Sequence, residues 1–143
     1  RPSNNYGIGQ YIEKLIPKSV KYLNLGRKIP IHNNGSPVRG WLHAADTASA
    51  VIHLIEKNIK NEIYNISGNY YDTNLNVSKK IIKNFNGDDE YKKYLDFSYS
   101  RKGQDVRYSV DDSKLKATGW VPVKRFDEEL PSIINFYKDN YIW

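Results

Sequence analysis

The sequence predicts one domain of the α/β or α+β class. Segments with apolar residues at helical spacing alternate along its 143 residues with short apolar segments typical of strands. Apolar residues make up 39% of the chain, which is enough for one hydrophobic core. Cysteine is absent, so disulfide scaffolds, thiolate metal sites and thiol nucleophiles are excluded. No apolar stretch is long enough to span a bilayer, and no signal peptide opens the chain.

The first predicted helix covers residues 11–25. Its apolar side chains recur at helical spacing and form one face, which consists of Ile12, Leu15, Ile16, Val20 and Leu23. Pro17 predicts a kink or a helix start near that position, and Gly26 predicts the end.

Two short strands are predicted next, over residues 27–32 and 38–43. The turn between them, residues 33–37, contains Asn34-Gly35, a pair that readily adopts positive φ angles.

The second helix is predicted over residues 47–57, with Asp46 as its N-cap and Asn58 at its end. Its inward face is predicted to consist of Ala48, Val51, Ile52 and Ile55. Residues 62–68 then resemble a short strand that ends at a glycine.

The remaining chain predicts three more helices and one strand. The helices cover residues 77–85, 111–118 and 126–141, and the strand covers 95–99. In the last helix, Pro131 predicts that regular helix begins later than the apolar pattern does. A polar loop over residues 101–107 carries arginine at both ends.

The net charge of +6 does not by itself indicate a nucleic-acid partner. The basic residues are scattered and interleaved with acidic ones, which is typical of a solvated surface. An alternative is a non-catalytic module that stacks nucleic-acid bases on tyrosines beside lysines 92 and 93. We favour the first interpretation and expect neither nucleic acid nor a membrane as partner.

A small set of polar residues exceeds what the fold requires. Arg39, Arg101 and Arg107 lie on short strands or in a glycine-containing loop, where guanidinium groups suit a diphosphate. The amides of Asn4 and Asn5 offer both donors and acceptors to a ligand. The three histidines lack metal-ligand spacing, so we expect no metal. The chain has no glycine-rich nucleotide loop and no hydrolase or metalloprotease motif.

These residues belong to a series of motifs that resembles one family of enzymes. In chain order the motifs are SNNYG at 3–7, EKLIP at 13–17, VRGWL at 38–42, YNI at 64–66, NL at 74–75, RKGQDVRY at 101–108, GW at 119–120 and DNYIW at 139–143. The series resembles the carboxyl-terminal part of nucleoside-diphosphate-glucose 4,6-dehydratases, with the dTDP-glucose type as the most similar. These enzymes are extended members of the short-chain dehydrogenase/reductase superfamily.

The resemblance implies a binding site, residue by residue. The sugar nucleotide would contact Asn4, Glu13, Lys14, Leu15, Ile31, His32, Arg39, Asn74, Arg101, Gln104 and Asp105. Arg39 would hold the diphosphate, and Arg101 with its loop would close on the diphosphate and ribose. Asn5 would contact the nicotinamide end of NAD, the implied cofactor.

Several positions depart from the family pattern, among them residues 43–47, where His-Ala-Ala-Asp-Thr stands in place of Tyr-Val-Glu-Asp-His. His32-Asn33 stands where the family usually has Tyr-Gly, and that tyrosine stacks on the base, so thymine and uracil both stay open. Gln104 replaces a histidine, which keeps hydrogen bonding but not a titratable proton. Gly40 replaces an aspartate between Arg39 and Trp41.

The reaction that the resemblance implies has three steps. NAD takes hydride from C4 of the glucose, water is eliminated across C5 and C6, and hydride returns to C6. The glycine-rich loop and the Tyr-x-x-x-Lys pair of such enzymes lie in their amino-terminal half, and this sequence contains neither. We therefore expect no catalytic residue here, and no activity of this chain alone.

The resemblance also implies the organisation of the whole protein. Residues 1–143 would form the carboxyl-terminal, substrate-binding portion of an α/β, NAD-binding Rossmann-type enzyme, with a late Rossmann strand and helix at about 38–68. The missing methionine suggests a piece of a longer chain. As a whole, the protein would be a cytoplasmic homodimer acting on dTDP-glucose or UDP-glucose. A related epimerase or decarboxylase of nucleotide sugars is the alternative.

Overall fold

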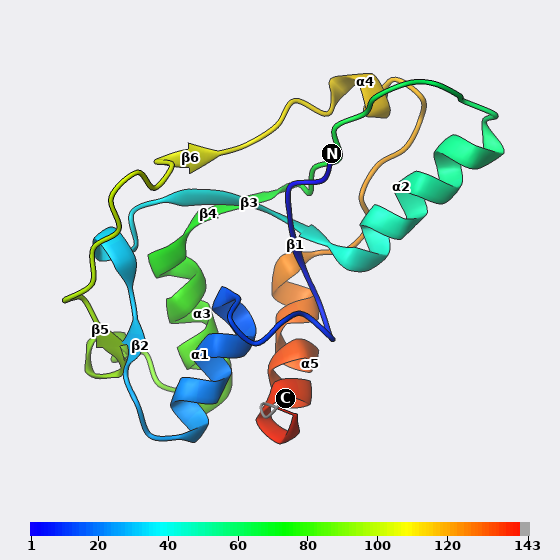
Figure 1. The fold of residues 1–143 in the computed structure, drawn as a ribbon. Coiled ribbons are helices and arrows are strands. Elements are labelled where there is room, and N and C mark those ends of the chain that lie inside the picture. The colour runs from blue at the N-terminus through cyan, green and yellow to red at the C-terminus, as the bar shows by residue number, and fades with distance from the viewer. Residues whose placement is uncertain (141–143) are drawn as a thin grey trace.

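The computed structural model describes residues 1–140 and is built around a short mixed sheet (Figure 1). Its middle strand, β3 (Val38–His43), matches the predicted strand. On one edge β3 pairs with the antiparallel β4 (Tyr70–Thr73). On the other it pairs in parallel with β1 (Asn4–Tyr6) and β6 (Arg107–Tyr108). A separate parallel pair joins β2 (Ile29–Pro30) to β5 (Leu95–Asp96).

Three helices pack together with the sheet and enclose the larger core. They are α1 (Leu15–Asn24), α3 (Asn74–Asn86) and α5 (Phe126–Asp139), which lie side by side in Figure 1. Their buried side chains meet Tyr6 and Trp41 from the sheet. The fully buried members include Ile16, Val20, Ile81, Ile82, Leu130, Ile134 and Tyr137. The apolar faces predicted for these three helices are confirmed except at Ile12, which is buried but precedes α1.

The ends of α1 follow from two residues. The helix begins at Leu15, two residues before Pro17, where the missing N–H of proline costs no helical hydrogen bond. It ends in a Schellman motif, in which Gly26 has a φ of +63° and donates to Leu23 O, while the Arg27 amide donates to Tyr22 O. The predicted start near Pro17 and stop at Gly26 are confirmed, whereas residues 11–14, predicted as part of this helix, lie before it.

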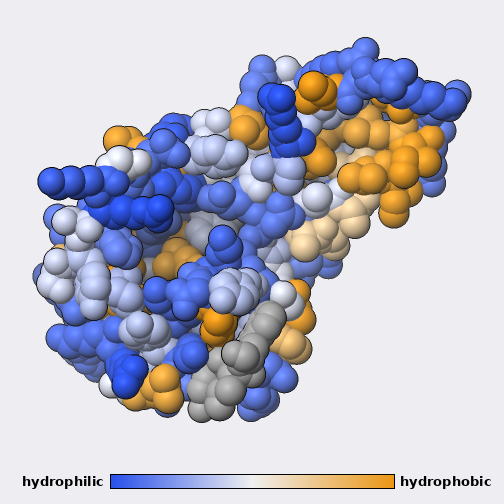
Figure 2. All heavy atoms as spheres, in the orientation of Figure 1, coloured by the Kyte–Doolittle hydropathy of each residue, from blue (hydrophilic) through white to orange (hydrophobic). Residues whose placement is uncertain are grey.

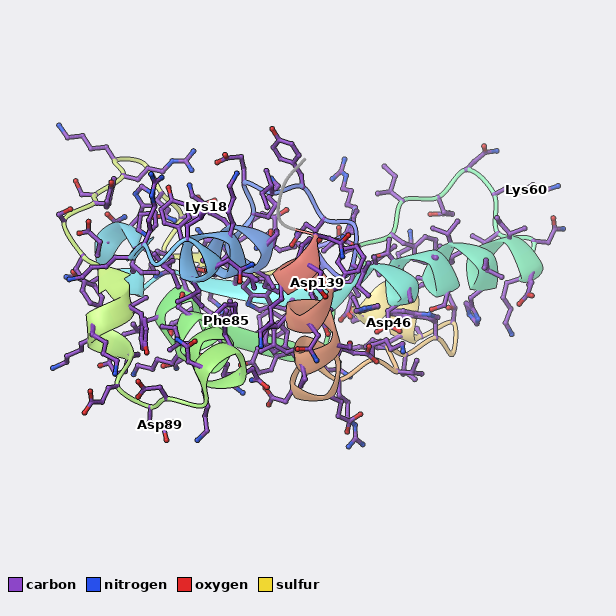
Figure 3. The ribbon with its side chains drawn as sticks, turned by 90° about the horizontal axis from the view of Figure 1, so that it is seen from below. Lys18, Asp46, Lys60, Phe85, Asp89 and Asp139 are labelled. Carbon is purple, nitrogen blue, oxygen red and sulfur yellow. The ribbon has the colours of Figure 1, made fainter. Side chains whose placement is uncertain are left out.

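The start and the inward face of α2 (Ala44–Glu56) differ from the prediction. The helix begins three residues earlier than expected, with the His43 ring accepting the cap bond from Ala45 N. Asp46 is not the N-cap. It is buried inside the first turn, where its carboxylate accepts the amides of Val123 and Lys124 (Figure 3). Asn58 ends the helix as predicted, with a φ of +54°.

The face of α2 predicted to point inward is exposed. Ala48, Val51, Ile52 and Ile55 are all solvent-accessible, and Ile55 is 70% exposed. The buried side of the helix carries Ala50, in a smaller core with Leu42, Ile66, Leu115 and Trp120. Apolar residues occur on both faces of this helix, so periodicity could not identify the buried one. Figure 2 shows the exposed face as a hydrophobic patch over α2.

Most predicted strands are shorter in the structure. Only Ile29–Pro30 of 27–32 and Leu95–Asp96 of 95–99 form strands. Residues 62–68 contribute a single bridge, from Ile66 to Pro2. The strand β4 was not predicted, because its sequence Tyr-Tyr-Asp-Thr does not alternate between apolar and polar residues. Between β2 and β3, the 3₁₀ turn η1 (His32–Gly35) has the positive φ angles that were expected.

The carboxyl-terminal helices also shift at their ends. α3 begins at Asn74 rather than 77, because the Thr73 hydroxyl caps it by accepting from Asn76 N. α4 (Ser113–Lys116) is shorter than predicted, and η2 (Tyr91–Tyr94) is an additional 3₁₀ turn. α5 runs through Pro131 rather than starting after it. The predicted helix end at Tyr141 and most of the DNYIW motif lie outside the described residues.

Candidate functional site

One cleft of about 840 Å³ collects the residues that the sequence singled out. It lies between β1, the start of α1, η1, β3, the start of α3 and the loop of residues 101–105, and Figure 2 shows a hollow there with hydrophilic surroundings. Of the residues that the sequence analysis proposed for binding, all but Ile31 and Arg107 line it: Asn4, Asn5, Glu13, Lys14, Leu15, His32, Arg39, Asn74, Arg101, Gln104 and Asp105. Ile31 is buried in the core behind it. Arg107, which was also expected to suit a diphosphate, lies outside the cleft on β6, with its guanidinium 5.6 Å from the centre of the Tyr71 ring.

The cleft carries an excess of positive charge. Among residues 1–140, the side chains of Lys14, Arg39 and Arg101 form no ion pair with a carboxylate, so their charge is available to a ligand. A fourth cation, Lys18, lies 3.5 Å from the carboxylate of Glu13. Three unpaired cations in one cleft complement the charge of a diphosphate.

Arg39 is fixed by backbone rather than by an acid. It extends from β3, and its Nη1 donates to Val38 O at 2.8 Å and to Asp105 O at 3.0 Å. These bonds occupy one end of the guanidinium group and leave the other N–H donors for an anion. A planar fork held in this way is suited to two phosphate oxygens.

The loop of residues 101–105 forms one wall of the cleft and is tied to η1. The side chain of Asn33 accepts the Arg101 amide at 3.0 Å and donates to Arg101 O at 3.1 Å and to Gln104 Oε1 at 3.0 Å. Gln104 is therefore used to hold the loop. Arg101 itself is exposed, with its side chain available.

The two asparagines of β1 differ in whether their side-chain amides are free to bind a ligand. The side-chain amide of Asn4 has no hydrogen bond to any described residue, and the same holds for Asn74 at the start of α3. The side chain of Asn5 is already engaged, since Oδ1 accepts from the Thr47 hydroxyl and Nδ2 donates to Ser3 O. Asn4 and Asn74 are thus the better candidates for direct ligand contacts.

Two helices begin at the cleft, which adds to its preference for anions. Leu15 is the first residue of α1, and Asn74 is the first residue of α3. Neither first turn contains an acidic residue. The partial positive charge of both helix N-termini therefore acts in the same direction as the lysine and arginine side chains.

Buried polar atoms without partners gather at the same place. In the described part of the chain six buried side-chain polar atoms lack a hydrogen bond, and four of them belong to residues that line the cleft. They are Ser3 Oγ, Gln10 Oε1, His32 Nδ1 and Trp41 Nε1. Because buried polar groups are almost always paired, this concentration indicates a polar ligand or ordered water there.

Several lining residues were missed by the sequence analysis. Trp41 lies two residues after Arg39 on the same strand, so the strand period places both on one face, and Lys18 follows Lys14 by one helical turn. Both could have been found from spacing alone. Gln10 could not, since only the chain's return toward β1, where Gln10 Nε2 donates to Asn5 O, brings it in.

No cluster of three or more residues able to hold a metal ion occurs within residues 1–140. In the same range, no helix is long and apolar enough to cross a membrane.

The comparisons with known proteins agree with this geometry. Residues 1–67 match the model of the NAD dependent epimerase/dehydratase family. The chain is 33% identical to dTDP-glucose 4,6-dehydratase of Escherichia coli over 99% of its own length and 41% of that enzyme. It is 37% identical to the enzyme of the same name from Haemophilus influenzae, over 96% and 44%. The chain thus spans about two fifths of these relatives.

Solved structures give the same result. The dTDP-glucose 4,6-dehydratase of Bacillus anthracis in complex with NAD superimposes with a TM-score of 0.87 at 37% identity, covering 98% of this chain and 44% of that one. The enzyme of Streptomyces venezuelae, also with NAD, gives 0.89 at 31% identity, covering 98% and 43%. A UDP-glucuronic acid 4-epimerase of Bacillus cereus gives 0.87 at 21% identity, which shows a common fold.

By fold and sequence, the chain is an α/β protein related to the NAD-dependent epimerases and dehydratases, whose solved members are Rossmann-type enzymes. Within that class it is similar over nearly its whole length to part of the dTDP-glucose 4,6-dehydratases. The predicted fold class and the resemblance drawn from the motifs are confirmed.

Proposed function

We propose that this chain is the carboxyl-terminal, sugar-nucleotide-binding part of an NAD-dependent dTDP-glucose or UDP-glucose 4,6-dehydratase. One observation carries the proposal: Lys14, Arg39 and Arg101, unpaired by any described carboxylate, meet in one cleft with free amides and orphaned buried polar atoms. Such a cleft suits a diphosphate flanked by a sugar and a nucleoside, both rich in hydrogen-bonding groups.

Different residues of the cleft bind different chemical groups of the sugar nucleotide. Arg39 binds the diphosphate through its free guanidinium donors, and Lys14 and Arg101 neutralise the remaining charge. The amides of Asn4 and Asn74 bond sugar or ribose hydroxyls. The ring of His32, which lies edge-to-face with Tyr99 at 5.6 Å between centroids, gives the base an aromatic surface smaller than a tyrosine would.

The cofactor of the whole enzyme is NAD, which supplies the acceptor and later donor of one hydride. Ser3 Oγ, a buried atom of the cleft without a hydrogen-bond partner, would be available to its nicotinamide end, and Asn5, whose side chain already bonds to Thr47 and Ser3, would line the same place. This chain contributes no glycine-rich loop for the dinucleotide and no Tyr-x-x-x-Lys pair. Its residues therefore bind and orient the sugar nucleotide, and the hydride and elimination chemistry belongs to the part that the relatives have in addition.

The same similarity supports three properties of the whole protein that we infer with the function. It acts in the cytoplasm, it forms a homodimer, and it supplies a deoxysugar pathway with the 4-keto-6-deoxy product. Within the chain, the strand and helix at about 38–68 would complete the Rossmann domain.

A titration with dTDP tests the binding function directly. We expect saturable binding that weakens in the Arg39→Ala variant, since hydrogen bonds to charged groups contribute about 1.5–3 kcal/mol, or roughly ten- to a hundredfold in Kd. Arg39→Lys should fall between the two, because it keeps the charge and loses the fork.

The matched control is Arg125→Ala. Arg125 is exposed, and within the described part of the chain its side chain pairs only with Glu128, away from the cleft. Its removal should leave the dTDP affinity unchanged. No saturable binding, or an equal loss in Arg125→Ala and Arg39→Ala, would refute the proposal.

A further inference from the structure

We propose that Asn33 is a positioning residue, which holds the loop of residues 101–105 in its ligand-binding arrangement before a ligand arrives. The inference rests on the proposed function of the cleft and adds to it how that site is organised.

Asn33 contacts the loop through both polar atoms of its side chain. Its side chain forms three hydrogen bonds, accepting Arg101 N and donating to Arg101 O and Gln104 Oε1, at 3.0 to 3.1 Å. Its backbone amide donates to Tyr99 O at 3.2 Å. One residue of η1 therefore fixes both the start and the middle of the loop.

The backbone of Asn33 makes this geometry available. Its φ is +50° and its ψ +44°, a left-handed conformation that asparagine adopts more readily than other side chains except glycine. Glycine would adopt the same backbone and lose the three side-chain bonds. Asparagine thus both adopts the left-handed backbone of the turn and supplies the side-chain hydrogen bonds to the loop.

The far end of the loop is held by different groups. Asp105 O accepts from Arg39, and Val106 O accepts from the Val38 amide, where β6 begins to pair with β3. Gly103, whose φ of +70° favours glycine, lies between the two loop residues that Asn33 contacts, Arg101 and Gln104. Without the side chain of Asn33, the segment from Tyr99 to Gly103 would be held by the backbone bond from residue 33 and by the contact of the Tyr99 ring with His32.

The expected consequence concerns affinity. A loop that is ordered in the free protein does not have to be ordered on binding, so less of the interaction free energy is lost. The guanidinium of Arg101 forms no hydrogen bond or ion pair with any of residues 1–140 and can meet the ligand, while the Arg101 backbone is fixed at both the N–H and the C=O.

The adjacent Asn34 provides a matched control. Its φ is +54°, its side chain is exposed, and it forms no side-chain hydrogen bond to a described residue. Asn33→Gly and Asn34→Gly therefore change the same residue type, in the same turn and in the same backbone conformation. Only the first removes the bonds to the loop.

The experiment measures amide hydrogen exchange and dTDP affinity on the 143-residue chain and both variants. Without ligand, residues 99–105 of Asn33→Gly should exchange faster than in Asn34→Gly. The Kd for dTDP should rise about tenfold in Asn33→Gly only, consistent with the loss of about three weak hydrogen bonds. If Asn33 had a purely structural role, thermal stability would fall more in Asn33→Gly than in Asn34→Gly. We expect it to change equally in the two variants.

The outcomes separate the two proposals. If the unmodified chain binds dTDP and the two variants bind it equally, or if loop exchange is equal in both, the role of Asn33 is overturned while the function of the cleft stands. If the unmodified chain shows no saturable dTDP binding, the function of the cleft fails first and the positioning role with it.

Discussion

Gly35 allows the turn η1 to approach the first residues of α3 more closely than any other amino acid would. A Cβ at this position would lie 2.7 Å from Leu75 Cβ and 2.9 Å from Leu75 N, and the φ of Gly35 is +71°. Because Leu75 follows Asn74, the same contact sets the position of a cleft residue.

We expect Gly35→Ala to destabilise the fold and to weaken dTDP binding. The left-handed backbone costs alanine about 1–2 kcal/mol, and the clash adds to it. Gly87→Ala is the control, since Gly87 has the same φ of +71° and no atom within 4 Å of the added Cβ. Urea unfolding should show a larger loss for Gly35→Ala than for Gly87→Ala, and equal losses would contradict the close approach.

At the scale of the elements, Asp72 joins β4 to α3. Its carboxylate accepts the Tyr70 hydroxyl, the Thr73 amide and the Asn76 side chain at 2.6 to 2.8 Å. Partial burial acts to raise the pKa of Asp72, but these hydrogen bonds outweigh it and hold the pKa below its usual range. Burial and the bond to Asp72 raise the pKa of Tyr70, so the hydroxyl stays a donor.

This junction should contribute a pH-dependent part of the stability. A lowered carboxyl pKa stabilises the fold fully above the unfolded value of about 3.9, and the contribution is lost as the pH falls through the folded value. The difference in unfolding free energy between the unmodified chain and Asp72→Asn should be constant above about pH 5 and shrink below about pH 4. Denaturant unfolding from pH 2 to 7 measures this difference in unfolding free energy. A difference that does not change with pH would contradict the lowered pKa of Asp72.

Some of the helices and strands could be predicted from the sequence and others could not. The packed faces of α1, α3 and α5 were predicted because each has a single apolar stripe, and β3 because its ends carry clear turn signals. The buried face of α2 and the strand β4 were not, since each depends on partners that only tertiary packing supplies. Most of the predicted site residues line one cleft because the motif series specified them, with Ile31 and Arg107 as the exceptions. Sequence could not predict that Gln10 lines the cleft or that Asn33 holds the 101–105 loop, since both depend on how the chain folds back.

At the scale of the whole molecule, the clearest exposed apolar surface lies on α2. Val51, Ile52 and Ile55 are 47%, 54% and 70% exposed on one helix, and Figure 2 shows the patch that they form. Contiguous apolar surface of this kind favours association. The cleft is lined by other elements, so binding there should not depend on this face.

We therefore expect the chain to associate as its concentration rises, and the double variant Ile52→Lys with Ile55→Lys to stay monomeric in sedimentation velocity. Its dTDP affinity should equal that of the unmodified chain. Val123→Lys, at a single exposed position off this helix, is the control and should associate as the unmodified chain does. Equal association of all three proteins would show that the patch is not responsible.

The central claim is that the cleft between β1, α1 and the 101–105 loop binds a nucleoside-diphosphate sugar, and a hydrogen-exchange footprint tests it most directly. Addition of dTDP-glucose should slow amide exchange at residues 3–5, 14–18 and 101–105. Residues 122–128, which line a separate pocket of about 680 Å³, should be unaffected. Protection at 122–128 instead, or no protection at saturating ligand, would contradict the account.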